Sequence, residues 1–162
     1  MNSWENLSVD FEGRLKDPII GGRKPVSNTV ETRVLYAETD AMGIVYYANY
    51  LRWFEMGRTS LMRSLGISYG EMTARGIHLP VSEVFCKYLR SARYDDVLTI
   101  ETAVDWVRRA SIQFSYRILR PADGAELVVG KTLHAFVDGE GKIVKIPTPL
   151  KEKMQGSHFP LD

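Results

Sequence analysis

A single helical segment followed by a long run of alternating segments is the feature that most constrains the fold of this chain. Apolar residues recur at helical spacing over 48–65, whereas side chains alternate with a period of two in the segments beyond residue 81. Another alternating segment, at 29–37, precedes the helix. Since no long helix separates the later strands, a doubly wound parallel sheet is disfavoured. The order predicts an α+β fold in which an antiparallel sheet packs against one helix.

The helix predicted over 48–65 has an apolar stripe wide enough to cover one face of a sheet. Gly66 predicts its end, because glycine adopts the left-handed conformation of a C-terminal cap without strain. Ser68 and Glu71 form a capping-box pattern, which predicts a short second helix that ends near Gly76. The stripe contains Tyr50, Phe54, Leu61 and Leu65, joined by Leu51 and Met62.

The remainder of the chain is predicted to form strands. Turn sequences, Pro-Ala-Asp-Gly and Asp-Gly-Glu-Gly, separate the last of them. The predicted strands are 81–90, 97–106, 111–119, 126–137 and 142–146. We therefore expect one domain at 29–150, a leader at 1–28 and a proline-containing tail at 151–162. The leader shows no sustained period and includes Gly-Gly-Arg-Lys-Pro, so partial disorder is expected there.

Length, charge and cysteine content narrow the classes of function. A chain of 162 residues has the size of one domain, and 21 Lys and Arg against 20 Asp and Glu give a net charge of +1. That balance provides no general field for nucleic acid or an acidic membrane. Cys86 is the single cysteine, and the first residues lack the apolar run of a secretory signal. We expect a cytoplasmic protein without membrane insertion, because no apolar stretch approaches the ~20 residues of a spanning helix.

Two sequence blocks resemble one known family. Residues 38–50 are Glu-Thr-Asp-Ala-Met-Gly-Ile-Val-Tyr-Tyr-Ala-Asn-Tyr. This block is similar to the signature of the 4-hydroxybenzoyl-CoA thioesterase family: an Asp, a Gly three residues later, two apolar residues, two aromatics or an aromatic and a His, and then Asn-Tyr. The block Tyr-Asp-Asp-Val-Leu-Thr-Ile-Glu-Thr at 94–102, followed by Arg-Arg-Ala-Ser at 108–111, also resembles that family. The resemblance implies the hotdog fold, in which a five- or six-stranded antiparallel sheet wraps around a long central helix.

The resemblance also implies that Asp40 is the catalytic carboxylate and that the backbone amide of Tyr47 is the oxyanion donor. Hydrolysis of a thioester needs one group to activate water or attack the carbonyl, and another to stabilise the developing charge. A half-desolvated carboxylate in a loop suits the first role, and the unpaired N–H groups of a first helical turn suit the second. The alternative for Asp40 is an Asx-type turn with Gly43.

Gly43 and Asn49 of the first block each allow two interpretations, and the side chain of Tyr47 bears on the acyl group. Gly43 either permits a positive φ or close backbone approach that the thioester requires, or is an ordinary turn glycine. Asn49 either holds the loop by hydrogen bonds to its backbone or helps to cap the helix. The Tyr47 side chain stands where many bacterial members of the family carry His, which hints at an aryl or other compact acyl group.

Cationic residues are needed for the phosphates of CoA. The resemblance implies that Arg108 and Arg109 contact them, with a solvated hairpin turn as the alternative. Further candidates are Arg90, Arg93 and Lys145.

Other chemically active residues are expected to be structural. A second family of hotdog thioesterases carries its catalytic carboxylate on the central helix, where Glu55 is the candidate, but a helical Glu is more often solvated or ion-paired. Cys86 is expected to be a small buried hydrophobe, and no serine lies in a nucleophile elbow. His78, His134 and His158 form no metal or triad pattern.

We therefore expect an acyl-CoA thioesterase that acts on an aryl or short- to medium-chain acyl group without metal or cofactor. The resemblance implies a homodimer or homotetramer whose sheets pair edge to edge and whose sites use two chains. Two alternatives remain. One is a non-catalytic module that binds acyl-CoA or acyl-carrier protein, and the other is a hotdog hydratase or dehydratase, which relies on an Asp and His pair.

Overall fold

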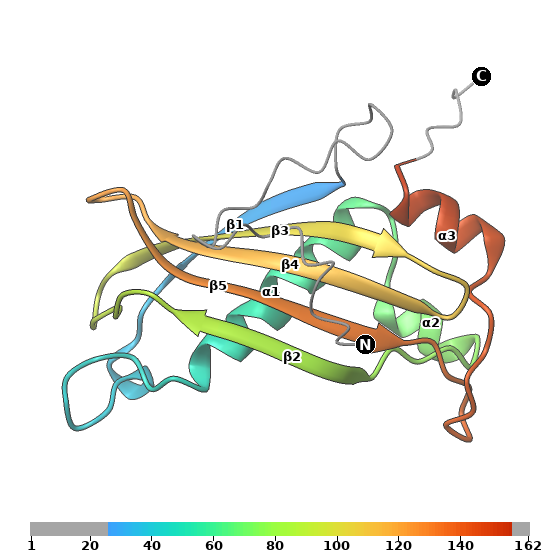
Figure 1. Cartoon of the computed structure of the whole chain (residues 1–162), viewed down its shortest axis with the longest axis horizontal. Coiled ribbons are helices and arrows are strands. Elements are labelled where there is room, and N and C mark those ends of the chain that lie inside the picture. Colours follow the sequence, from blue (N-terminus) through green and yellow to red (C-terminus); the bar gives the residue numbers. More distant parts are fainter. Residues whose placement is uncertain (1–25, 157–162) are drawn as a thin grey trace, which may run out of the picture.

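A five-stranded antiparallel sheet forms the main layer of the computed structural model, which describes residues 26–156. The strands are β1 (Ser27–Arg33), β2 (Val81–Tyr88), β3 (Val97–Val107), β4 (Ser111–Arg120) and β5 (Ala125–Ala135). They lie in the order β1-β3-β4-β5-β2, so that β1 and β2 form the two edges (Figure 1). Every neighbouring pair is antiparallel. The strand predicted before the helix and the four main strands predicted after it are confirmed.

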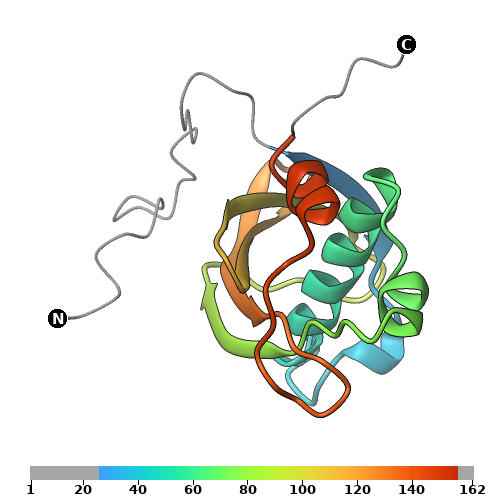
Figure 2. The same ribbon diagram turned by 90° about the vertical axis from the view of Figure 1, so that its right-hand side faces the viewer.

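The longest helix, α1 (Asn49–Ser64), lies across one face of the sheet, and the sheet curves around it (Figure 2). A 3-10 turn, η1 (Tyr36–Glu38), precedes it, and the predicted short helix follows as α2 (Tyr69–Ala74). The buried face of α1 consists of Tyr50, Trp53, Phe54, Gly57, Leu61 and Met62. Leu51 is exposed, contrary to the predicted stripe, while Trp53 and Gly57 belong to the buried face.

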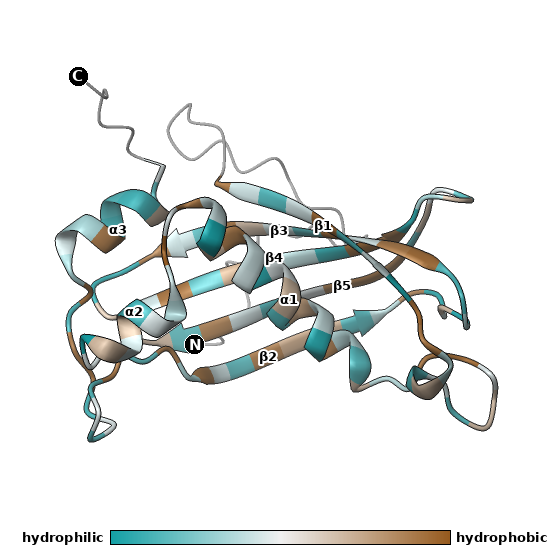
Figure 3. Cartoon of the chain, turned by 180° about the vertical axis from the view of Figure 1, so that it is seen from behind, coloured by the Kyte–Doolittle hydropathy of each residue, from teal (hydrophilic) through white to brown (hydrophobic). Residues whose placement is uncertain are grey.

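The core lies between α1 and the strands behind it, where the hydrophobic residues of the sheet gather (Figure 3). The ring of Phe54 stacks on Tyr116 of β4, with centroids 4.3 Å apart. Gly130 of β5 makes room for Phe54, since a Cβ atom at that position would overlap the ring. Aromatic packing therefore fixes the position of α1 over the centre of the sheet.

The strand predicted at 142–146 is wrong. The structure has only an isolated bridge between Val137 and Ile143 there. The N–H of Val144 donates to Phe136, whereas the N–H of Ile146 donates to Arg109, so the segment divides its backbone bonds between two neighbours instead of forming a ladder.

The segment after Pro147 forms a helix, α3 (Thr148–Met154), which the sequence analysis did not predict. Pro149 occupies the first turn, where a missing N–H leaves no hydrogen bond unmade. Met154 is fully buried and anchors the helix on the core. The expected disorder of the leader concerns residues that lie almost entirely outside 26–156. Within 26–156, no helix is long and apolar enough to cross a membrane.

Candidate active site

A tight loop between η1 and α1 carries the first of the two sequence blocks. The N–H of Asp40 donates to Ile44 O at 2.8 Å, and the N–H of Gly43 donates to Asp40 O at 2.9 Å. Thr39 and Val45 form an antiparallel bridge at the base of the loop. Gly43 has a φ of +72°, which residues with a Cβ rarely adopt. The positive φ that the sequence suggested for this glycine is therefore present.

The Asp40 carboxylate is half-buried and uses one of its two oxygens in the loop. Oδ1 accepts a hydrogen bond from the N–H of Met42 at 2.8 Å, which is an Asx turn. Among residues 26–156, no donor contacts Oδ2. The turn predicted as the alternative role is formed, with Met42 as the donor, and it leaves the second oxygen available for chemistry.

Asn49, the first residue of α1, ties the helix to the start of the loop. Its Nδ2 donates to Glu38 O at 2.9 Å. The same carbonyl accepts the N–H of Tyr46 at 2.9 Å. No side-chain cap hydrogen bond is present at the start of α1. Of the two interpretations of Asn49, the contacts favour the one in which it holds the loop.

The backbone amide of Tyr47 lies just before the first turn of α1. Within the described part of the chain, its N–H has no hydrogen-bond acceptor, and Tyr47 is 61% exposed. The carbonyl of the same residue accepts a hydrogen bond from Tyr88 Oη at 3.0 Å. The Tyr47 carbonyl is thus held by Tyr88, while the Tyr47 N–H, which belongs to the preceding peptide unit, has no acceptor among residues 26–156 at the positive end of a helix.

Aromatic residues of β2 and α1 lie beside Tyr47. The Tyr88 ring lies 6.3 Å from the Tyr47 ring and 5.5 Å from the Tyr50 ring. Burial raises the pKa of Tyr88 and of Tyr50, so both hydroxyls stay protonated and can only donate or accept hydrogen bonds at neutral pH. Burial also raises the pKa of the neighbouring Cys86 thiol, which disfavours a cysteine nucleophile.

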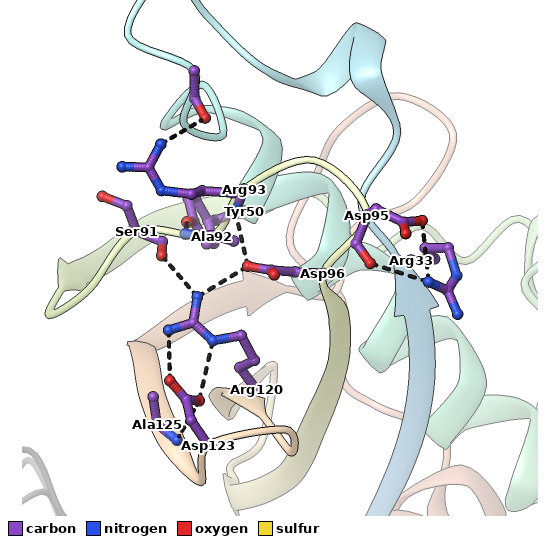
Figure 4. Close-up of polar contacts among 11 residues, drawn as sticks. Arg33, Tyr50, Ser91, Ala92, Arg93, Asp95, Asp96, Arg120, Asp123 and Ala125 are labelled. Atoms are coloured by element: carbon purple, nitrogen blue, oxygen red, sulfur yellow. Dashed lines mark hydrogen bonds and ion pairs between the residues drawn. The ribbon is translucent and has the colours of Figure 1, made fainter.

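A second loop, residues 91–96, forms hydrogen bonds with the loop of residues 39–48, here called the Asp40 loop (Figure 4). The N–H of Val45 donates to Ala92 O at 2.9 Å, and the N–H of Ala92 donates to Tyr50 Oη at 3.1 Å. The guanidinium of Arg93 donates to Gly43 O at 3.4 Å. The sequence marked residues 94–96 through the family resemblance and Arg93 as a candidate phosphate contact, but it did not predict this support, because a contact between backbone groups has no residue-type signature.

The predicted phosphate-binding residues Arg108 and Arg109 lie far from this loop within one protomer. They occupy the turn between β3 and β4, at the end of the sheet opposite the loop of residues 39–48 (Figures 1 and 3). The Arg108 guanidinium packs over the Trp106 ring at 4.3 Å. Of the candidate cations, Arg93 is the one that contacts the Asp40 loop.

Glu55 and the histidines lie away from Asp40. Glu55 lines a shallow cleft of about 540 Å³ between α1 and β1, together with Arg52 and Arg63. His78 pairs with Val137 at the far end of β5, and His158 lies outside the described residues. Within residues 26–156, no cluster of His, Cys, Asp and Glu could hold a metal ion.

His134 belongs to a buried polar network under α1. Its Nε2 lies 3.1 Å from a guanidinium nitrogen of Arg58 and 2.8 Å from Thr132 Oγ1, and its Nδ1 lies 3.1 Å from Leu79 O. Burial, with the Arg58 charge, lowers the pKa of His134 to about 4. The histidine is neutral at physiological pH, and its contacts are structural, as expected.

Comparison with known proteins gives consistent results. A family model described as the thioesterase-like superfamily matches residues 34–154. The acyl-CoA thioester hydrolase YbgC of Escherichia coli O6:H1 is 36% identical over 106 residues, which cover 65% of this chain and 78% of that protein. The chloroplastic acyl-acyl carrier protein thioesterase ATL3 of Arabidopsis thaliana is 27% identical over 161 residues, 94% of this chain and 85% of that protein.

The fold comparison agrees with the sequence comparison. The structure of 4-hydroxybenzoyl CoA thioesterase from Pseudomonas sp. strain CBS-3 superposes with a TM-score of 0.72 at 29% identity, covering 78% of this chain and 98% of the other. The predicted hotdog fold is confirmed.

Proposed function

Since the chain belongs to the thioesterase-like superfamily and is a thioester hydrolase, we propose that it hydrolyses an acyl-CoA thioester to the free acid and CoA at the Asp40 loop. One observation carries this proposal. The same short loop presents a carboxylate oxygen without a donor and, seven residues later, a backbone N–H without an acceptor among residues 26–156. These are the two groups that thioester hydrolysis needs.

Asp40 supplies the carboxylate in either of two ways. As a base, it accepts a proton from water while the water oxygen attacks the thioester carbon. As a nucleophile, Asp40 Oδ2 attacks that carbon itself, and water later cleaves the resulting mixed anhydride. In both cases the C–S bond breaks and the CoA thiolate leaves and takes up a proton. The Asx turn to Met42 limits rotation of the carboxylate in either mechanism.

The Tyr47 amide stabilises the negative charge that develops on the thioester oxygen. A preorganised donor in a partly dry site contributes roughly 3–4 kcal/mol to such a step. The hydrogen bond from Tyr88 to Tyr47 O limits rotation of the Tyr47 backbone, and so helps to hold the preceding peptide unit, which carries the Tyr47 N–H. Since Tyr88 belongs to β2 and Tyr47 to the loop, this bond also couples the edge strand to the site.

The site is completed by a second copy of the chain that pairs along β2. This edge strand has exposed apolar residues on both faces, including Val84 at 47% and Phe85 at 38% exposure. An unpaired apolar edge of this kind is an aggregation hazard unless it is covered. Two-fold antiparallel pairing of β2 strands would extend the sheet and close the side of the site that α1 leaves open.

The same two-fold arrangement accounts for the location of the basic turn. Rotation about an axis normal to β2 exchanges the two ends of the sheet. The turn with Arg108 and Arg109 of one copy then lies at the same end as the Asp40 loop of the other copy. We therefore assign the CoA phosphates to Arg108 and Arg109 of one copy, with Arg93 of the other copy nearer the thioester.

The acyl group and its carrier are tested together by thiol release. The panel consists of benzoyl-, hydroxybenzoyl-, short-chain and long-chain acyl-CoA, with one acyl-acyl carrier protein, since ATL3 is named for that carrier. We expect fast release from one CoA class, aryl or short- to medium-chain. Release from the carrier-protein substrate alone would move the assignment to that carrier. No release from any substrate by the folded protein would favour a binding role.

A further inference from the structure

Arg120, at the end of β4, is linked to the Asp40 loop through the segment 91–96. We propose that Arg120 is a positioning residue for the reaction: it fixes segment 91–96, and that segment fixes the Asp40 loop. The proposal rests on the proposed function, because it assigns Arg120 a role in the rate of hydrolysis. Arg120 does not touch the substrate or Asp40.

The guanidinium of Arg120 is fully engaged by two carboxylates (Figure 4). Its Nε and one terminal nitrogen bind the two oxygens of Asp123 at 3.1 and 2.8 Å. Its other terminal nitrogen binds Asp96 Oδ2 at 2.9 Å and Ser91 O at 3.3 Å. A guanidinium that is bound on both sides in this way has little freedom to move. The turn after β4 is thereby joined to both ends of the segment that supports the site.

Asp96 also binds the backbone in the middle of segment 91–96. The oxygen that binds Arg120 also accepts the N–H of Arg93 at 2.9 Å. Ala92, between Ser91 and Arg93, is completely buried. The backbone of 91–93 is thus held at Ser91 O by Arg120 and at Arg93 N by Asp96, which leaves the carbonyl of Ala92 little freedom.

Ala92 makes the contact with the Asp40 loop. Its carbonyl accepts the N–H of Val45, which lies two residues before the proposed oxyanion donor Tyr47. Its N–H donates to Tyr50 Oη in the first turn of α1. Arg120 therefore stands three hydrogen-bonded steps from Val45, through Asp96, the Arg93 peptide and Ala92. A shift of about 1 Å at a reacting group can cost roughly a hundredfold in rate.

Arg117 provides a matched control on the same strand. It also binds two carboxylates, Glu101 at 2.9 Å and Glu126 at 2.7 Å, and its side chain is 33% exposed against 21% for Arg120. Within the described residues, Arg117 makes no hydrogen bond to segment 91–96. Replacement of either arginine removes a doubly paired cation from β4, but only one replacement releases the support of the Asp40 loop.

The kinetic test compares Arg120→Gln, Arg120→Lys and Arg117→Gln well below their unfolding temperatures. We expect Arg120→Gln to lower kcat by about tenfold or more with KM within about twofold of wild type, Arg120→Lys to recover part of the loss, and Arg117→Gln to leave kcat unchanged. Equal kcat values for the Arg120→Gln and Arg117→Gln variants would overturn the proposal.

A second measurement is independent of turnover and therefore separates this proposal from the proposed function. Hydrogen exchange of the amides of residues 44–46 should accelerate in Arg120→Gln and remain as in wild type in Arg117→Gln, since the Val45 N–H is the one that Ala92 protects. Unchanged exchange in Arg120→Gln would refute the positioning role even if the wild type hydrolyses no substrate. Accelerated exchange without turnover would retain the link and refute the hydrolase assignment alone.

Discussion

Gly57 of α1 lies so close to Thr102 of β3 that a Cβ atom at Gly57 would overlap the threonine hydroxyl and approach Ile100 Cγ2 to 2.8 Å. The missing side chain lets the helix axis sit against the sheet. Because the Asp40 loop leads directly into α1, the depth of the helix also sets the position of the Tyr47 amide. The fold and the candidate site thus share one close contact.

Gly57→Ala is expected to lower the free energy of unfolding by about 1–3 kcal/mol, because the new methyl group forces α1 away from β3. The sign is diagnostic, since alanine is about 1 kcal/mol more favourable than glycine within a helix. Gly70→Ala is the control: it also lies in a helix, where its Cβ would meet only Ser68 Oγ at 3.5 Å. Urea denaturation should show opposite shifts for the two variants. A stabilised Gly57→Ala would contradict the close contact.

The sheet and α1 were predictable from sequence because alternation and helical spacing follow directly from which side chains are buried. Gly57 was missed because glycine carries no apolar side chain, whereas Trp53 lies three residues after Tyr50, at regular helical spacing, and was omitted from the predicted stripe. Their burial is decided by β1 and β3, which approach α1 from far along the chain. The helix α3 was missed because its 7 residues are too few for a helical period to be recognised, although a proline near its start is compatible with a first turn.

The candidate site was predictable only as a local motif. Asp40, Gly43, Tyr47 and Asn49 lie in one loop and one helix start, so their sequence spacing limits their distances. The support from Ala92 and the ion pairs of Arg120 depend on contacts between residues that are tens of positions apart in the sequence, such as Arg120 and Asp96. Neither residue type nor spacing in the sequence predicts such contacts.

Stability should depend on pH through His134. Its pKa in the folded protein, about 4, lies below the ordinary value of 6.5, so the unfolded chain binds a proton more readily between these values. The free energy of unfolding should therefore fall as the pH drops from about 6.5 towards 4, by up to roughly 2–3 kcal/mol from this residue. In His134→Gln this part of the pH dependence should vanish, whereas His78→Gln should keep it. Parallel curves for wild type and His134→Gln would contradict the assignment.

The oligomer should depend on the β2 edge. We expect wild type to have a mass of two or four times the 18.4 kDa of one chain in light scattering. Val84→Lys places a charge on the edge strand and should shift the mass towards 18.4 kDa with loss of turnover. Ile143→Lys replaces another exposed apolar residue, in the segment after β5, and should change neither mass nor turnover. A wild type that is monomeric and active would exclude the two-copy site.

The cationic residues should contribute to CoA binding and not to chemistry. Arg108→Ala combined with Arg109→Ala is expected to raise KM for acyl-CoA by about fivefold or more, since each exposed ion pair is worth up to about 1 kcal/mol. The acyl thioester of N-acetylcysteamine has no phosphates, so its kcat/KM should not change. Arg63→Ala, in the cleft between α1 and β1, serves as the control. Equal losses for both substrates would show that the turn acts on structure instead of phosphate recognition.

The central claim is that the Asp40 carboxylate performs the hydrolysis, and kcat of Asp40→Asn tests it most directly. Asparagine can keep the Asx turn to Met42, so the loop is retained while the base or nucleophile is lost. Asp138→Asn is the matched control, because Asp138 forms the same turn with Glu140 at 2.9 Å in the loop after β5. We predict a fall in kcat of at least about a hundredfold for Asp40→Asn with an unchanged circular dichroism spectrum, and wild-type kcat for Asp138→Asn. A folded Asp40→Asn variant with a kcat near that of wild type would contradict the account.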